Sequence, residues 1–182
     1  MGALVVLAGP SGVGKGAIFA GLHDRDPRYW RSVSWTTRAK RASEQDGREY
    51  HFVTREQFEA ERAAAGFLES FEVFGSAFGN LYGTPRRPVD EHLAAGDIVI
   101  LEIDVQGALA VREQLPEAML VFIAPPSSDE LRARLVGRND GMSPEQLQAR
   151  IDTAAAELAQ ADRFDAVIVN DALDRAIDEV AT

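Results

Sequence analysis

The sequence contains no cysteine and only two lysines, Lys15 and Lys40, among its 182 residues. The lack of cysteine excludes disulfide bonds, thiolate chemistry and cysteine metal sites. No apolar run approaches the ~20 residues of a transmembrane helix, and the first residues lack the basic start of a signal peptide. The three histidines are scattered without metal-ligand spacing. We therefore expect a cytoplasmic protein without a metal bound by cysteine or histidine.

The composition is that of a globular protein with an acidic surface. Hydrophobic residues make up 46% of the chain, charged residues 26%, and the net charge is -10. This length and apolar content suit one domain with a sizeable core. The negative charge argues against nonspecific binding to nucleic acid or to an anionic membrane. A phosphate site must then be a local cluster of basic side chains.

A phosphate-binding loop is predicted where the short apolar run Ala3 to Ala8 leads into Gly9-Pro10-Ser11-Gly12-Val13-Gly14-Lys15. A buried strand that enters a glycine-rich turn and then a helix directs backbone N–H groups and the helix dipole at one anion. Lys15 adds a compact positive charge for the outer phosphates. The loop therefore predicts a nucleoside triphosphate site.

Strand and helix patterns alternate along the chain, which is typical of a parallel sheet covered by helices. The predicted strands are Leu4 to Ala8, Ser32 to Trp35, Asp97 to Ile103, Met119 to Ala124 and Ala166 to Val169. The predicted helices are roughly Lys15 to His23, Pro88 to Ala95, Val105 to Gln114, Ser128 to Val136, Pro144 to Ala161 and Leu173 to Val180. Capping boxes precede two of these helices, at Ser127-x-x-Glu130 and Ser143-x-x-Gln146. The pattern predicts an α/β fold.

Two stretches interrupt this alternation. Residues 36–84 are too long for one crossover and contain an extended segment, Tyr50 to Val53, and a helix, Arg55 to Ala65. They are interpreted as an inserted subdomain. Gly137 to Met142 is a polar, glycine-bounded break between two helices that suits a mobile flap. A reaction between two anionic ligands needs such parts, because both ligands must be enclosed and water excluded.

The insertion carries arginines among hydroxyl residues, from Ser34-Trp35-Thr36-Thr37-Arg38 through Arg41 and Glu44 to Tyr50. Arg38 and Arg41 could grip a phosphate in bidentate fashion, with Tyr50 as a hydroxyl donor. The alternative interpretation is a solvated surface run, which arginines at this density often form.

At these residues the sequence resembles the guanylate kinases, which transfer the γ-phosphoryl of ATP to GMP, and the resemblance covers nearly the whole chain. Its motifs beyond the loop are Ser34 to Arg38 with Arg41 and Glu44, Gly47-x-x-Tyr50-x-Phe52-Val53, Phe67-Leu68-Glu69, Phe78-Gly79-Asn80-Leu81-Tyr82-Gly83-Thr84, Ile100 to Gly107, Arg134-Leu135-x-x-Arg138 and Ile168-Val169-Asn170-Asp171. The loop alone is shared by many kinases, whereas this combination in this order is specific. The resemblance implies one domain with a P-loop core (residues 1–35 and 85–182, a parallel sheet flanked by helices), a mixed α/β NMP-binding subdomain (about 36–84) and a short lid (about 137–143).

The resemblance also implies a GMP site. Its phosphate-binding residues are Arg38, Arg41, Tyr50 and Tyr82, its guanine-binding residues are Ser34, Glu69 and Thr84, and Glu44 and Asp104 complete it. A carboxylate such as Glu69 can accept hydrogen bonds from N1–H and the 2-amino group of guanine, whereas adenine has no such paired donors. Asp104 is placed where the two substrates meet, although it could also cap the helix that begins at Val105.

For ATP and the transfer step, the resemblance implies a second set of residues. The ATP-binding residues are Gly9, Pro10, Ser11, Gly12, Val13, Gly14, Lys15, Gly16, Ala17 and Asn170, and the catalytic residues are Lys15, Arg134, Arg138 and Arg150. No protein metal ligand is assigned, since Mg²⁺ is expected through the phosphates and water. The three arginines could instead be exposed helix residues, and Asn170 could cap the last helix together with Asp171.

Three departures from the family pattern stand out. Gly16 and Ala17 remove the hydroxyl that usually reaches the metal. The spacing from Glu69 to Tyr82 exceeds the usual one by about four residues near Gly75-Ser76-Ala77-Phe78, so Glu72 competes with Glu69 as the guanine reader. Glu102 stands where an aspartate is common.

Two other functions are compatible with this architecture. A ribose 1,5-bisphosphate kinase would be expected to lose the guanine-reading set Ser34, Glu69 and Thr84, and a non-catalytic module that holds phosphorylated partners would be expected to have a degraded ATP loop. This sequence keeps both the guanine-reading set and the lysine of the ATP loop. We therefore predict a guanylate kinase, monomer or homodimer, that uses ATP with Mg²⁺ and accepts GMP and dGMP.

Overall fold

The computed structural model describes residues 2–73, 79–137 and 143–182. Its larger sheet has five parallel strands in the order β2-β7-β1-β8-β9. These strands are β1 (Ala3–Ala8), β2 (Tyr29–Arg31), β7 (Ile98–Glu102), β8 (Met119–Ala124) and β9 (Ala166–Val169). The predicted α/β architecture is confirmed, with β1 near the middle of the sheet.

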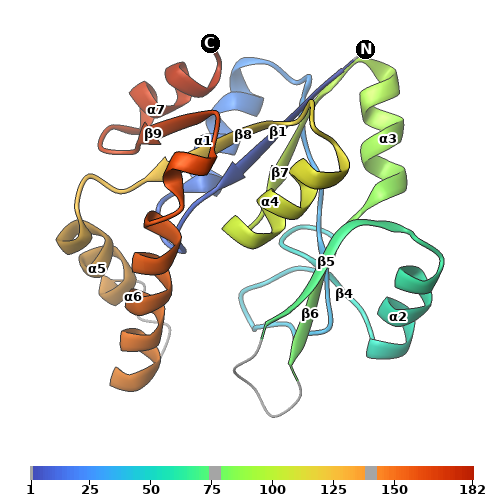
Figure 1. The fold of residues 1–182 in the computed structure, drawn as a ribbon, viewed down its shortest axis with the longest axis horizontal. Coiled ribbons are helices and arrows are strands. Elements are labelled where there is room, and N and C mark those ends of the chain that lie inside the picture. The colour runs from blue at the N-terminus through green and yellow to red at the C-terminus, as the bar shows by residue number, and fades with distance from the viewer. Residues whose placement is uncertain (1, 74–78, 138–142) are drawn as a thin grey trace.

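Helices cover both faces of the larger sheet (Figure 1). On one face α1 (Lys15–Arg25) and α7 (Leu173–Val180) pack against side chains such as Leu7. On the other face α3 (Arg86–Ala95) and α4 (Val105–Gln114) pack against Val6. Alternate residues of β1 thus enter two separate cores, which explains why this strand is apolar throughout.

The smaller sheet has four strands in the order β4-β3-β6-β5. They are β3 (Trp35–Thr36), β4 (His51–Phe52), β5 (Phe67–Val73) and β6 (Asn80–Pro85), and the helix α2 (Arg55–Ala63) packs beside them. Phe58 of α2 stacks on Phe67 with ring centroids 4.5 Å apart, in a core shared with Leu81.

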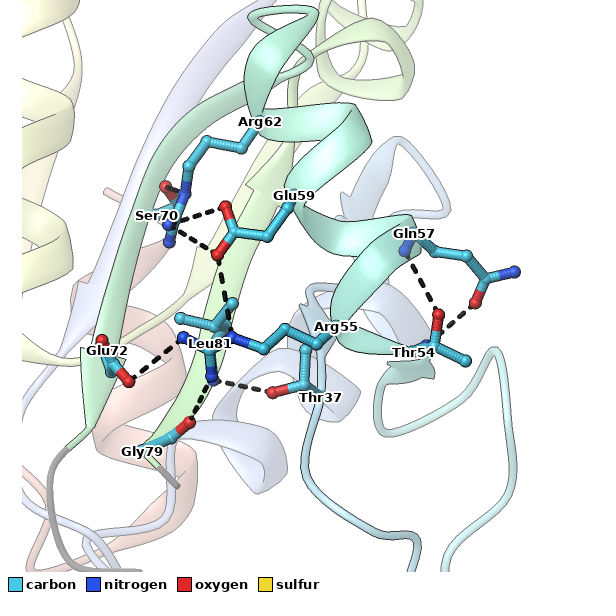
Figure 2. A network of polar contacts seen from close by, with 10 residues as sticks. All are labelled: Thr37, Thr54, Arg55, Gln57, Glu59, Arg62, Ser70, Glu72, Gly79 and Leu81. Carbon is cyan, nitrogen blue, oxygen red and sulfur yellow. Dashed lines mark hydrogen bonds and ion pairs between the residues drawn. The ribbon is translucent and has the colours of Figure 1, made fainter. Parts of the chain in front are cut away.

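A polar network fixes α2 to this sheet (Figure 2). Thr54 and Gln57 form a capping box at the helix start. Arg55 donates to the carbonyl of Gly79 at 3.2 Å and pairs with Glu72 at 3.4 Å, and Arg62 donates to Ser70 at 3.2 Å. The helix is therefore tied to β5 by both apolar and charged contacts.

The helices α5 (Ser128–Gly137) and α6 (Pro144–Leu158) precede a short 3-10 helix, Ala161–Arg163. The capping box predicted at Ser143 is confirmed, with both reciprocal hydrogen bonds to Gln146. Figure 1 shows α5 and α6 on one side of the molecule and the smaller sheet with α2 on the other. Residues 138–142 of the predicted lid lie outside the described residues.

One predicted strand, Ser32 to Trp35, is wrong. The chain joins the larger sheet earlier, through Tyr29–Arg31, and Trp35 already pairs with β4 and β6 of the smaller sheet. The reason is that β2 is an edge strand whose residues are all half-buried, so it lacks the apolar run of a central strand. In the described ranges, no helix has both the length and the apolar character for crossing a membrane.

Candidate active site

The loop between β1 and α1 is shaped by glycines in conformations that other residues rarely adopt. Gly9 has φ of 133°, and a β-carbon there would lie 2.3 Å from the carbonyl oxygen of Ile123. Gly14, at the N-cap of α1, has φ of 103°. The Nζ of Lys15 donates to the carbonyl of Gly9 at 2.5 Å and to that of Pro10 at 3.3 Å. The loop thus folds around the lysine as a phosphate-binding loop does.

Asn170 and Arg134 brace this loop from behind. Asn170 is buried and donates from Nδ2 to the carbonyl of Val13 at 2.8 Å. Arg134 donates to the carbonyl of Val13 at 3.4 Å and to that of Asn170 at 3.2 Å. The alternative in which Asn170 and Asp171 cap the last helix is wrong, since α7 has Ala172 at its N-cap without a side-chain cap.

One cavity of about 640 Å³ joins the loop to the smaller sheet. Its lining includes sixteen residues predicted as site residues: Gly9, Ser11, Gly12, Gly14, Lys15, Gly16, Ala17, Ser34, Arg38, Arg41, Glu44, Tyr50, Glu69, Tyr82, Asp104 and Arg150. The sequence alone thus identified most of the cavity wall, although its residues come from distant parts of the chain.

Five predicted residues that the structure describes do not line the cavity: Pro10, Val13, Thr84, Arg134 and Asn170. Arg138 and the candidate insertion Gly75 to Phe78 lie outside the described residues.

Six further lining residues were not predicted as site residues: Phe71, Gly83, Glu102, Ile103, Thr153 and Glu157. Phe71 follows Glu69 by two residues on one strand, and the period of two in a strand places both on the same face. Arg150, Thr153 and Glu157 follow the spacing of three and four that defines one helix face. These spacings are the signals that could have found them.

Arg38 is held in place within the cavity by Glu44. Two hydrogen bonds of 3.0 and 2.7 Å join the guanidinium to the carboxylate, and their side chains are only 17% and 11% exposed. Glu44 also accepts from the backbone N–H of Arg41 at 2.8 Å. The hydrogen bond from Arg38 is the main reason why the pKa of Glu44 is lowered. One carboxylate thereby fixes the guanidinium of Arg38 and the backbone at Arg41.

Aromatic rings form the next part of the wall. The guanidinium of Arg38 lies 5.5 Å from the ring centroid of Tyr50, and Tyr50 packs edge-on against Tyr82 at 5.7 Å. Burial raises the pKa of Tyr50, so its hydroxyl keeps its proton. Phe71 stacks on Tyr82 with ring centroids 5.8 Å apart.

Glu69 is the buried acid of the cavity, with 5% of its surface exposed. Its Oε1 accepts from the hydroxyl of Thr84 at 2.6 Å, whereas Oε2 is buried and has no hydrogen-bond partner among the described residues. Burial raises the pKa of Glu69 to about 7. An orphaned buried oxygen is costly, so it indicates a ligand that donates a hydrogen bond.

The alternative acid, Glu72, is engaged elsewhere. Its side chain is 33% exposed, pairs with Arg55 at 3.4 Å and lies outside the cavity wall. The geometry therefore favours Glu69 over Glu72 as the acid that faces a ligand.

Asp104 lies between the two ends of the cavity. It caps α4 by accepting from the backbone N–H of Gly107 at 2.7 Å, so the capping alternative is confirmed. Burial raises the pKa of Asp104, and the charge of Lys15 opposes this shift. Burial likewise raises the pKa of Glu157. The site thus places carboxyl groups close to its lysine.

The donor set near the loop fits a magnesium ion that is bound mainly by substrate phosphates. No group of three acidic or histidine side chains forms a metal site within the described residues. Glu102 and Asp104 nevertheless supply hard carboxylate oxygens on the cavity wall. Mg²⁺ is commonly bound by one or two carboxylates together with phosphates and water.

The chain is similar to guanylate kinases along its whole length. The family model described as guanylate kinase matches residues 1–182. A guanylate kinase of Synechococcus sp. (strain CC9902) is 50% identical over 181 residues, which cover 100% of this chain and 94% of that protein. A guanylate kinase of Nocardia farcinica (strain IFM 10152) is 49% identical over 181 residues, which cover 100% of this chain and 92% of that protein.

Solved structures agree with this similarity. The crystal structure of guanylate kinase from Anaplasma phagocytophilum matches with a TM-score of 0.79 and 33% identity, covering 99% of this chain and 82% of that chain. A shikimate kinase from Bacteroides thetaiotaomicron shares the fold, with a TM-score of 0.54 at 14% identity over 98% of this chain and 95% of that chain.

Proposed function

Because the chain belongs to the guanylate kinase family and transfers the γ-phosphoryl of ATP to GMP, we propose that the cavity at the loop holds both nucleotides. The phosphates of ATP lie at the loop, and GMP lies against the smaller sheet. The observation that carries this assignment is the orphaned oxygen of Glu69 in the same cavity as Lys15.

The loop supports binding of the ATP phosphates through its backbone and Lys15. The left-handed glycines give the loop the conformation of a phosphate-binding turn, which leads into the start of α1, where the helix dipole favours an anion. Lys15 lies inside this turn and supplies the positive charge. Asn170 and Arg134 act behind the loop by holding the carbonyl of Val13.

Glu69 supports recognition of guanine. Its Oε2 is buried and has no hydrogen-bond partner among the described residues, and guanine offers N1–H and a 2-amino group as neighbouring donors to the ionised form of the carboxyl group. A base without these donors would leave the buried carboxylate unpaired. This cost is the strongest basis on which the site would reject a nucleotide other than GMP. Ser34 lines the same region, and Thr84 holds Glu69 through its hydroxyl.

The phosphate of GMP is assigned to the group of Arg38, Arg41, Tyr50 and Tyr82. Arg38 and Arg41 supply charge-assisted donors, and the buried Tyr50 supplies a neutral hydroxyl. Glu44 neutralises part of the charge of Arg38 and fixes the orientation of its guanidinium group. The guanidinium of Arg38 is thus held in the cavity before a phosphate binds.

The transfer step needs positioning and charge neutralisation rather than a general base, since the attacking oxygen of GMP is already ionised. Lys15 and Arg150 line the cavity from opposite elements, α1 and α6, and are the described residues best placed to neutralise the transferring group. Mg²⁺, when bound, neutralises charge on the phosphates of ATP. Arg138 is proposed for the same role on the family resemblance alone.

The other two functions are less well supported by this cavity. A ribose bisphosphate has hydroxyl groups but lacks the paired N1–H and amino donors that match a carboxylate such as Glu69, and a module without catalysis has no use for the braced loop around Lys15. Use of dGMP, the monomer or homodimer state and the cytoplasmic location stay predictions.

A coupled assay for ADP release tests the proposal. We expect turnover with GMP and dGMP, and none with AMP, UMP, CMP or ribose 1,5-bisphosphate. The variant Lys15→Ala should lose this turnover while it still binds GMP. Tight GMP binding without turnover would instead support the binding module, and turnover confined to ribose 1,5-bisphosphate would support the sugar kinase.

A further inference from the structure

Phe71 has the largest wholly apolar side chain among the described residues that line the cavity. The residue is only half-buried, although an aromatic ring gains free energy from full burial. Part of its surface is therefore left for a ligand in the cavity to cover.

The pairing of β5 with β6 places Phe71 beside the buried acid of the site. Glu69 pairs in register with Thr84, and two residues further along β5, Phe71 pairs with Tyr82. Side chains two apart on a strand share one face and lie about 7 Å from each other along it. The smaller sheet thus presents an acid with an orphaned oxygen on one rung of the ladder and two aromatic rings on the next.

The ring of Phe71 is held in place by two contacts within the protein. It stacks on Tyr82 with ring centroids 5.8 Å apart and planes 17° apart. It also reaches α4, which packs against β5 (Figure 1), because a β-carbon on Gly107 would lie 3.4 Å from Cε1 of Phe71. The same point lies 3.3 Å from Oδ1 of Asp104. The ring is therefore a fixed part of the wall between the smaller sheet and α4, and binding a ligand against it needs little ordering of the protein.

The position of this ring relative to Glu69 and Tyr82 identifies the part of GMP that it would contact. Glu69 is assigned to the N1 and 2-amino edge of guanine, and Tyr82 belongs to the group assigned to the phosphate. The rest of the base must then pass the rung of Phe71 and Tyr82. A phenyl ring has no group that hydrogen-bonds to a ribose hydroxyl or a phosphate. It does offer a flat apolar surface for the face of a base, which is how aromatic side chains commonly bind nucleotides.

We propose that Phe71 is a specificity-determining residue that packs against the face of guanine while Glu69 accepts hydrogen bonds from its edge. The proposal rests on the function proposed above, since Glu69 and the phosphate-binding residues set the position of GMP. Phe71 thereby adds affinity for a nucleotide with a planar base, and a sugar phosphate without a base gains nothing from it.

Nuclear magnetic resonance of the wild-type protein tests the contact directly. With ¹³C-labelled phenylalanine rings and bound GMP, a nuclear Overhauser effect should connect one ring to H8 of guanine. The signals of that ring should be missing from the spectrum of Phe71→Leu, which assigns them. GMP that binds without this effect overturns the proposal. Failure of GMP to bind the wild type would instead contradict the proposed function.

Binding of two ligands to Phe71→Ala separates a contact with the base from a structural role. We expect the dissociation constant of GMP to rise by roughly ten- to hundredfold, as loss of a base-stacking ring does. The affinity for ribose 5-phosphate, which lacks the base, should not change. Unchanged ADP affinity will show that the variant is folded.

Phe19→Ala is the matched control, because Phe19 is also half-buried and does not line the cavity. It should leave GMP affinity unchanged. If Phe71 acted only by holding Tyr82, Phe71→Ala would weaken GMP and ribose 5-phosphate equally. Equal weakening of the two ligands, or unchanged GMP affinity in Phe71→Ala, overturns the proposal.

Discussion

At the scale of single residues, Glu69 shows how burial and one hydrogen bond set a pKa. Burial raises its pKa to about 7, the hydrogen bond from Thr84 lowers it, and the charge of Asp104 raises it. The folded protein therefore binds an extra proton between the ordinary pKa of 4.5 and about 7. Since the unfolded chain releases that proton first, the contribution of Glu69 to the stability of the ligand-free protein falls as pH rises through this range.

The affinity for GMP should follow the ionisation of Glu69. The two guanine donors need the ionised carboxylate of Glu69 as their acceptor. The dissociation constant of GMP should therefore rise by roughly tenfold for each pH unit below about 7, as Glu69 becomes protonated. Thr84→Val removes the hydrogen bond that lowers the pKa and should shift this profile to higher pH. Calorimetry across the pH range measures both profiles. Coincident profiles for the two proteins would argue against this role of Glu69.

Glu44 should affect GMP binding through Arg38. Glu44→Gln weakens the paired hydrogen bonds that fix the guanidinium, so we expect the dissociation constant of GMP to rise by about tenfold, the worth of one charge-assisted bond. ADP affinity should not change. Glu49→Gln removes an acid from the same segment that does not line the cavity and is the matched control. Equal effects of both variants on GMP would contradict the account.

At the scale of elements, the sequence predicted correctly those elements that have a strong local motif. The loop before α1 and the capping residues of α6 were read from neighbouring residues alone, and the structure bears out both elements. The strand Ser32 to Trp35 was misplaced because the true strand, Tyr29–Arg31, is a short edge strand. β5 and β6 were not predicted as strands, because they are stabilised mainly by pairing with each other, which the residues of either segment do not indicate.

The capping box of α2 gives a prediction at this scale. Thr54→Ala removes the side chain that accepts from the backbone N–H of Gln57 (Figure 2). We expect the free energy of unfolding to fall by about 1 kcal/mol, measured by urea denaturation. Thr54→Ser keeps the oxygen and should restore most of that loss. Equal stability of the alanine variant and the wild type would show that packing of Phe58 alone holds the helix.

At the scale of the whole molecule, the site forms where the loop, the smaller sheet and α6 meet. The loop lies at the carboxyl ends of parallel strands, as ligand sites in such sheets do. Thr153 and Glu157 follow Arg150 at helical spacing, but only the structure shows that this face of α6 lines the cavity.

A ligand that spans the cavity should stabilise the protein more than either nucleotide alone. Adenosine and guanosine joined by a chain of five phosphates would engage Lys15 and Glu69 in one molecule, and the gain follows from mass action. Thermal unfolding should show a larger rise of Tm with this compound than with ADP and GMP added together at the same concentration. An equal rise would indicate that the two nucleotides bind without sharing the cavity.

The most direct test of the two-ended cavity is calorimetric binding of ADP and GMP to two variants, Lys15→Ala and Glu69→Gln. These residues line the same cavity, Lys15 from α1 and Glu69 from β5 of the smaller sheet. The account predicts that Lys15→Ala loses ADP binding and keeps GMP binding, and that Glu69→Gln loses GMP binding and keeps ADP binding. Loss of the same nucleotide in both variants, or of neither, would contradict it.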